Sequence, residues 1–187
     1  MTVIAAALTM NNGVVIVGDS ELSNSFTRDS DGYSKIWEHE EEGYIFGGAG
    51  RLRELQIIKH HVEWPYYRDI YPPEEFVVKE VVPRMRDALI DNGIKMDDYE
   101  SSFIMAWDDI LVVIDEDFGV TVPLSARYAI GSGQSEALGF LGNEGGWTKE
   151  DVIEAARRAT VTAVGVGGPL YIVDSIDMVV QQADLIV

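Results

Sequence analysis

The sequence contains no cysteine. Disulfide bonds, thiolate metal sites and cysteine nucleophiles are therefore excluded by composition. Basic side chains are scarce, because 14 Lys and Arg stand against 32 Asp and Glu and give a formal net charge of -18. Binding to a phosphate backbone depends on Lys and Arg, so nucleic acid is a poor candidate partner. The acidic excess favours solubility through self-repulsion, or an acidic surface that attracts basic partners.

Long apolar runs are also absent from the sequence. No run approaches the roughly 20 residues that a membrane-spanning helix needs, and the start of the chain lacks the basic and apolar stretches of a signal peptide. We therefore expect no membrane association and a cytoplasmic location. The length of 187 residues and the hydrophobic fraction of 47% suit one soluble globular domain over residues 1–187.

The common catalytic and metal-binding motifs are missing. The sequence has no G-x-S-x-G elbow, no phosphate-binding P-loop and no H-E-x-x-H zinc helix. His60 and His61 are adjacent, so on a helix they point in different directions and do not form a joint metal site. Residues 29–32 (DSDG) resemble the start of a calcium loop without its closing glutamate, which favours a turn. Residues 115–117 (DED) are expected to be solvated in a hairpin turn.

Apolar runs separated by turn residues predict strands in the first part of the chain. Asn11, Asn12 and Gly13 separate the first two runs and indicate a hairpin. A second hairpin is predicted to close on the glycine-rich residues 47–50. The strands are expected at residues 2–8, 14–17, 35–39 and 44–46.

Helical periodicity begins at Arg51. One helix is expected to end before Pro65, and a second, after Pro72 and Pro73, should be kinked or divided at Pro83. Strands are then predicted at residues 102–107, 110–114, 120–122 and 127–130.

A short helix is predicted after residues 131–133. Thr148 and Asp151 have the spacing of a capping box ahead of a further helix, whose inner face would carry Val152, Ala156, Ala159 and Ala163. Closing strands are predicted at residues 171–173 and 178–180. The order of strands, two helices, strands, two helices and strands indicates an α+β fold with antiparallel sheets covered by helices.

The remaining candidate for chemistry is the N-terminus. Thr2 follows Met1, and methionine aminopeptidases accept a small second residue, so Thr2 can become the first residue of the mature chain. A free α-amine has a pKa of about 8 and can accept the proton of the hydroxyl on the same residue. Thr2 would then supply both a nucleophile and a base. Alternatively, Thr2 is an ordinary β-branched residue that opens a strand.

The residues around this candidate occur in a recognisable order. Thr2 opens the first strand, Asp19 follows Gly18 at the end of the second, Lys35 opens the third, and Gly47 begins the glycine run that ends the fourth. Lys35 lies 33 residues after Thr2, and Gly47 lies 12 residues after Lys35. A Gly-Ser-Gly segment centred on Ser132 follows a later strand.

In this order and spacing the chain resembles the proteasome-like N-terminal nucleophile (Ntn) hydrolases. It resembles proteasomal β-subunits and, more closely, the peptidase subunit of the bacterial ATP-dependent heat-shock protease. The resemblance implies a four-layer α-β-β-α sandwich, in which two antiparallel sheets face each other and a helix pair covers each outer face. It also implies a threonine-type peptide hydrolase that acts on polypeptides and uses no cofactor or metal.

The resemblance assigns a role to each matched residue. Thr2 would attack the carbonyl group, and an ammonium at Lys35 would favour its alkoxide form. Asp19 would hold Lys35 charged and in place. The amide of Gly47 would donate to the oxyanion, and Ser132 would hold or relay the proton of the α-amine.

The resemblance also implies a homo-oligomeric ring with the nucleophiles in an inner chamber, to which an ATP-dependent unfoldase delivers substrate. It is incomplete before Gly167 and Gly168, where Ala163 and Val166 replace the Asp and Ser of proteasomal β-subunits. Two alternatives remain: a non-catalytic structural or assembly protein that retains Met1, and an Ntn amidase that acts on small molecules.

Overall fold

Two five-stranded antiparallel sheets form the centre of the molecule. The protein is represented by a computed structural model that describes residues 1–11, 13–23, 28–29, 33–142 and 145–183. The first sheet has the strand order β10-β1-β2-β11-β12. Its strands are β1 (Ile4–Leu8), β2 (Val14–Asp19), β10 (Arg127–Ile130), β11 (Leu170–Asp174) and β12 (Gln181–Gln182).

The second sheet has the order β5-β6-β7-β8-β9. Its strands are β5 (Ile36–His39), β6 (Tyr44–Ala49), β7 (Ser102–Trp107), β8 (Ile110–Ile114) and β9 (Val120–Thr121). A short ribbon of β3 (Leu22–Ser23) and β4 (Arg28–Asp29) forms a separate pair. The predicted hairpins at the start of the chain are therefore confirmed, and each belongs to a different sheet.

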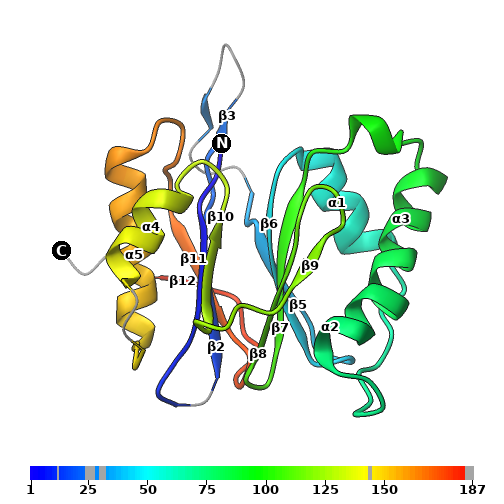
Figure 1. Ribbon diagram of the computed structural model, residues 1–187. Coiled ribbons are helices and arrows are strands. Elements are labelled where there is room, and N and C mark those ends of the chain that lie inside the picture. The colour runs from blue at the N-terminus through cyan, green and yellow to red at the C-terminus, as the bar shows by residue number, and fades with distance from the viewer. Residues whose placement is uncertain (12, 24–27, 30–32, 143–144, 184–187) are drawn as a thin grey trace.

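Helices cover the outer face of each sheet, so the molecule has four layers (Figure 1). The helices α4 (Gln134–Leu141) and α5 (Lys149–Thr162) lie on the first sheet. The second sheet is covered by α1 (Leu52–His61) and by a second helical segment that contains α2 (Pro73–Phe76), the π-helical turn η1 (Val77–Val81) and α3 (Val82–Asp91). The 3-10 turn η2 (Met96–Asp98) follows α3. The predicted α-β-β-α arrangement is confirmed.

Three apolar clusters hold these layers together. Alternate residues of β1 face opposite directions, so Ile4 and Ala6 pack between the sheets while Ala5 and Ala7 pack under α5. The small side chains on this strand, which lies between β10 and β2, allow close packing of the layers.

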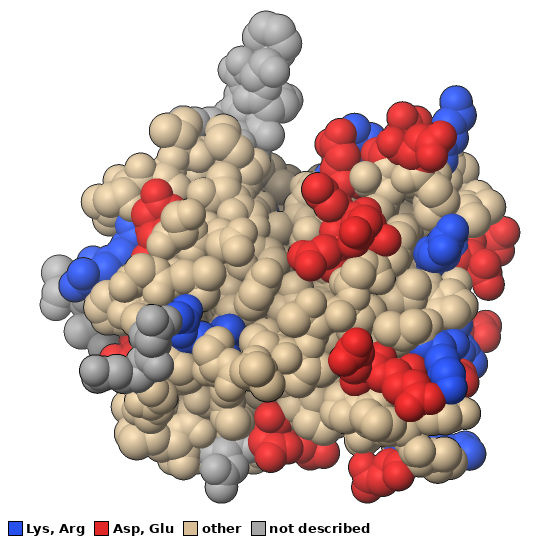
Figure 2. Space-filling model, viewed as in Figure 1, with Lys and Arg blue, Asp and Glu red and all other residues tan. Residues whose placement is uncertain are grey.

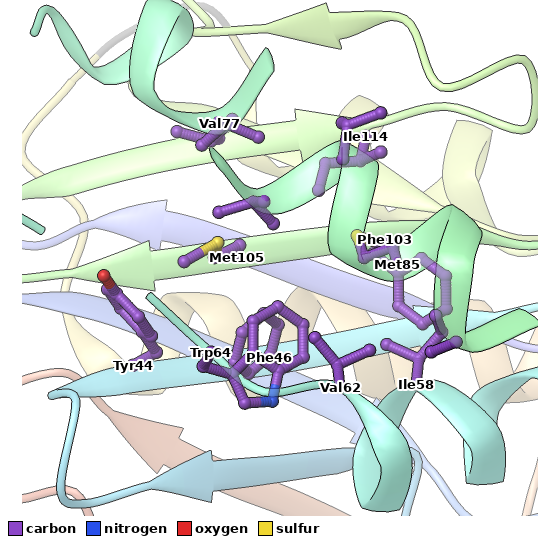
Figure 3. Close-up of a cluster of buried hydrophobic side chains, with 14 of the residues drawn as sticks. Tyr44, Phe46, Ile58, Val62, Trp64, Val77, Met85, Phe103, Met105 and Ile114 are labelled. Atoms are coloured by element: carbon purple, nitrogen blue, oxygen red, sulfur yellow. The ribbon is translucent and has the colours of Figure 1, made fainter. Parts of the chain in front are cut away.

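The cluster beneath α1 and α3 is rich in aromatic side chains. Figure 3 shows Tyr44, Phe46 and Trp64 side by side in it, and the Phe46 and Trp64 ring centroids are 4.4 Å apart.

Local sequence signals explain several helix boundaries. Thr148 and Asp151 form the predicted capping box, with the Asp151 amide donating to Thr148 Oγ1 at 3.2 Å. Pro83 has no amide hydrogen, and it lies in the first turn of α3, directly after the π-helical turn. The helix is not divided there, because Val77, Val81 and Val82 all keep right-handed helical backbone angles, and the irregularity near Pro83 is the π-helical turn.

Two boundary predictions are wrong. The last strand is β12 rather than residues 178–180, because Met178 adopts a positive φ of 54° in a turn. Ala163 lies one residue beyond the end of α5 with extended backbone angles, although its amide still donates to the Ala159 carbonyl and its side chain packs on the predicted apolar cluster. None of the helices in the described part of the chain combines the length and apolar character needed to cross a bilayer.

Acidic side chains are unevenly spread over the surface. On the face shown in Figure 2, Asp and Glu gather mainly over the half of the molecule that contains the second sheet and its helices. The half that contains α4 and α5 shows fewer of them on this face. On this face, the negative charge is therefore concentrated over the second sheet and the helices that cover it.

His39 at the end of β5 predicts a pH dependence of stability. Burial, and then the nearby charges of Lys59 and His60, lower the pKa of His39 to about 4 from the usual 6.5. As pH falls below 6.5 the unfolded chain takes up a proton at this histidine, whereas the folded protein does not until about pH 4. Stability from this group is therefore lost as pH falls through that range.

We expect His39→Gln to lose less thermal stability than the wild type between about pH 7 and about pH 5, measured by thermal unfolding. Carboxylates titrate in both proteins, so the difference between the two curves isolates His39. Parallel curves would contradict the effect.

Candidate active site

Thr2 lies two residues before the start of β1, buried against the loop that follows β10. Pairing of Ile4 with Ile130 brings this loop to the start of the chain. The Thr2 amide donates to Ser132 Oγ at 3.1 Å, and the Thr2 carbonyl accepts from the Gly133 amide at 3.1 Å. Gly131 has a φ of +87°, and a Cβ there would lie 2.9 Å from the Thr2 carbonyl carbon. The loop therefore fits closely around Thr2.

Asp19 and Lys35 form a buried ion pair beside Thr2. Lys35 Nζ lies 2.9 and 3.0 Å from the two carboxylate oxygens of Asp19, and the side chains are only 3% and 0% exposed. Asp19 also accepts from the amides of Val3 at 3.0 Å and Gly167 at 3.3 Å. These extra hydrogen bonds offset part of the cost of burying the two charges.

Burial shifts both groups of the pair towards their neutral forms. It lowers the pKa of Lys35, and the charges of Asp19 and Glu21 act in the opposite direction. It raises the pKa of Asp19, again opposed by Lys35. A lysine whose pKa is lowered exchanges a proton more readily near neutral pH, as proton-transfer chemistry requires.

The carbonyl oxygen of Met1 is the point where the polar groups of the site meet. Thr2 Oγ1 donates to this oxygen at 2.7 Å, and Lys35 Nζ donates to it at 3.2 Å. The Met1 side chain packs against Gly165, with its sulfur 2.9 Å from the position that a Cβ on this glycine would take. The hydroxyl and the ammonium are therefore close enough to act on the same carbonyl group.

A pocket of about 300 Å³ opens beside Thr2. The residues that line it come from the N-terminus, the end of β6, the start of β7, the β8–β9 turn and the loop after β10. They are Met1, Thr2, Ala49, Gly50, Glu100, Ser102, Glu116, Gly131 and Ser132. Glu116 thus borders the pocket from the turn that the sequence predicted to be solvated.

Gly47 is not among the residues that line this pocket. It lies within β6, paired with Ile36 of β5 and Ile104 of β7, and a Cβ on it would fall on the side chain of Ile4. Gly50, three residues later, lines the pocket with Thr2.

The alternation of amide directions along β6 also favours Gly50 as the donor at this site. The Gly48 amide donates to the Lys35 carbonyl at 2.9 Å, and alternate amides of a strand face the same side. By the same alternation, carried one residue beyond the end of β6, we expect the Gly50 amide on the side of Lys35 and Thr2.

The structure also shows one hydrogen-bond donor of the site that the sequence did not identify. The Gly167 amide contacts Asp19 in the segment where Ala163 and Val166 depart from the β-subunit pattern. It is a backbone donor, so no side chain in the sequence signals it.

The other candidates lie elsewhere or outside the described residues. His60 and His61 end α1, and neither lines the pocket beside Thr2. Of the DSDG segment, residues 30–32 lie outside the described part of the chain. Two larger hollows of about 540 and 450 Å³ border Trp64, and neither contains a residue of the Thr2 site.

Comparison with known proteins supports the fold. No family model matches the chain, and no curated protein matches its sequence. The eukaryotic HslV from Trypanosoma brucei matches with a TM-score of 0.66 at 17% identity, over 92% of this chain and 98% of that one.

Two Anbu structures match as well. The Gly-1 mutant from Hyphomicrobium sp. strain MC1 has a TM-score of 0.70 at 14% identity, over 100% of this chain and 88% of its own. Anbu (ancestral beta-subunit) from Yersinia bercovieri has a TM-score of 0.71 at 11% identity, over 92% of this chain and 80% of its own. These likenesses show that the two-sheet sandwich is shared with HslV and Anbu, as expected for the Ntn hydrolase fold.

Proposed function

We propose that this protein is a threonine-type peptide hydrolase whose nucleophile is the Thr2 hydroxyl once Met1 has been removed. The observation that carries the proposal is the meeting of Thr2 Oγ1 and Lys35 Nζ on one carbonyl oxygen, that of Met1. In the mature site this position would be vacated, and the hydroxyl and ammonium would face a substrate carbonyl instead.

The residues of the site supply the nucleophile and the proton acceptor that the proposed reaction needs. Thr2 Oγ1 attacks the substrate carbonyl carbon, and its proton passes to the free α-amine. Removal of Met1 would convert the Thr2 amide nitrogen into that amine, 3.1 Å from Ser132 Oγ. The C–N bond then breaks, the amine product leaves with the proton, and water hydrolyses the Thr2 ester.

The negative charge of the tetrahedral intermediate needs a donor at the pocket. We assign this role to the Gly50 amide, because Gly50 lines the pocket and its amide faces the Lys35 side of β6. Loss of such a donor typically costs about 10²- to 10³-fold in rate. The role that the family resemblance implied for Gly47 is thereby moved three residues along the same glycine run.

A second candidate function is a structural or assembly protein that keeps Met1. The same contacts favour this function. With Met1 in place, its carbonyl oxygen accepts from both the Thr2 hydroxyl and the Lys35 ammonium, and the Thr2 nitrogen is an amide that cannot act as a base. An amidase that acts on small molecules is a third candidate, since it needs the same nucleophile and oxyanion donor.

We further propose that the protein works as a homo-oligomeric ring supplied by an ATP-dependent unfoldase. The shared fold with HslV and Anbu supports this, and aliphatic side chains such as Leu124, Val161 and Val164 are exposed on the isolated chain. Sedimentation velocity of the purified protein should show a discrete species larger than a monomer.

Controlled removal of Met1 tests the proposed function. Two cleavable N-terminal fusions are prepared, one leaving Thr2 as the first residue and the other leaving Met1. We expect only the first protein to hydrolyse fluorogenic peptides, because only its Thr2 has a free α-amine. Activity on small amides alone would favour the amidase, and equal inactivity of both proteins would favour the structural role.

A further inference from the structure

A buried carboxylate lies behind the glycine that borders the pocket. Glu54, in the first turn of α1, is only 1% exposed. Its Oε2 accepts from Ser101 Oγ at 2.6 Å and from the Glu100 amide at 3.3 Å. A carboxylate is costly to bury, so a position that served packing alone would be expected to hold an apolar side chain.

The same hydroxyl connects Glu54 to the segment after β6. Ser101 Oγ, fully buried, accepts from the Arg51 amide at 3.2 Å. Because Ser101 Oγ donates its proton to Glu54, its lone pairs remain directed at the Arg51 amide. A chain of two hydrogen bonds thus runs from Glu54 through Ser101 to the peptide group that follows Gly50.

Gly50 is also in direct steric contact with Ser101. It has a φ of +144°, and a Cβ at this position would lie 2.6 Å from Ser101 Cα and fall on the hydroxyl. The backbone therefore passes closely over Ser101, in a conformation that a side chain would prevent. The hydrogen bond to Arg51 and this contact together fix Gly50 against Ser101, the residue that precedes β7.

The Arg51 side chain is a second attachment of this segment, and its guanidinium also lies 3.9 Å from Glu54 Oε1. Its guanidinium lies 3.1 and 2.9 Å from the two carboxylate oxygens of Glu100, and it donates to the Asp98 carbonyl at 2.7 Å. These contacts are partly exposed, so the buried Glu54–Ser101 pair is the more rigid of the two attachments.

We propose that Glu54 and Ser101 are positioning residues that aim the Gly50 amide at the oxyanion of the reaction. The inference rests on the proposed hydrolase function and on Gly50 as its oxyanion donor. Neither side chain touches the substrate in this assignment. Their effect is to hold one backbone amide in the direction that the tetrahedral intermediate requires, as preorganised sites do.

The test compares Glu54→Leu, Glu54→Gln and Ser101→Ala in protein that begins at Thr2. Leucine has a similar size and no acceptor, whereas glutamine keeps an acceptor for Ser101. We expect Glu54→Leu and Ser101→Ala to lower kcat by about 10- to 100-fold with little change in KM, the order of loss caused by a misplacement of about 1 Å. Glu54→Gln should retain most of kcat.

Two inhibitors with the same peptide separate positioning from general damage. A peptide aldehyde forms a tetrahedral adduct with an oxyanion, so its affinity should fall in parallel with kcat in the two damaging variants. A peptide vinyl sulfone is attacked at a carbon–carbon double bond and places no charge at the Gly50 amide, so its rate of reaction with Thr2 should be unchanged. Val152→Ala, in the core beneath α5, is the destabilised control and should keep wild-type kcat.

Each result bears on one claim. If wild-type protein beginning at Thr2 is active and Ser101→Ala and Glu54→Leu keep full kcat, the positioning role is wrong while the hydrolase function stands. Equal loss of aldehyde affinity and vinyl sulfone reactivity would also overturn it, because the damage would then extend to Thr2. If the wild-type protein is inert, the proposed function fails and the inference fails with it.

Discussion

Replacing Lys35 by methionine should reduce peptide hydrolysis by about 10³-fold, within the usual range for removing a group that assists proton transfer. Lys35 Nζ is the cation beside the Thr2 hydroxyl, and methionine keeps much of the side-chain volume without the charge. The measurement is kcat/KM on a fluorogenic peptide with protein that begins at Thr2. Lys79→Met, which removes an exposed lysine paired with Glu75, is the matched control and should be fully active.

The single variant leaves Asp19 buried without its partner, which typically destabilises a protein by about 3–5 kcal/mol. A double variant, Asp19→Asn with Lys35→Met, removes both charges and keeps the shape of the pair. It should recover thermal stability relative to Lys35→Met and remain inactive. Wild-type activity in the folded double variant would show that the ion pair has only a structural role.

The positions of most helices and strands were predictable because they depend on local patterns, whereas the four-layer arrangement followed only from the family resemblance. Two periodicities, of strands and of helices, located most of the elements, and turn residues separated them. The capping box at Thr148 needed only a four-residue pattern. The error at Met178 arose because an apolar side chain was taken for a strand residue, whereas its positive φ is set by the surrounding turn.

The site was predictable only where a side chain carries the signal. Asp19, Lys35 and Ser132 are brought beside Thr2 as their order and spacing suggested. The choice between Gly47 and Gly50 depends on the register of β5 with β6, which the sequence of the glycine run does not specify.

Glu54 was missed for a different physical reason. In sequence it is an ordinary acidic residue in the first turn of a helix, a common position for a solvated carboxylate. Only the packing of α1 against Glu100 and Ser101, just ahead of β7, shows that it is buried and bonded to Ser101. Likewise, the Gly167 amide has no signature in the sequence, because any residue supplies one.

Substitution of Thr2 itself should have the largest effect. Thr2→Ala removes the hydroxyl and keeps the α-amine, so we expect hydrolysis to fall to the uncatalysed background, a loss of more than about 10³-fold. Thr2→Ser keeps the hydroxyl and should retain measurable activity. The contacts of the Thr2 backbone with Ser132 and Gly133 do not involve the side-chain hydroxyl, so both variants should fold.

The most direct measurement is intact-mass spectrometry of the purified protein after incubation with a threonine-directed peptide vinyl sulfone. The expected result is a chain that begins at Thr2 and carries one adduct, mapped to Thr2 and absent from Thr2→Ala. A chain beginning at Thr2 that remains unlabelled, or an adduct that persists in Thr2→Ala, would contradict the assignment of Thr2 as the nucleophile.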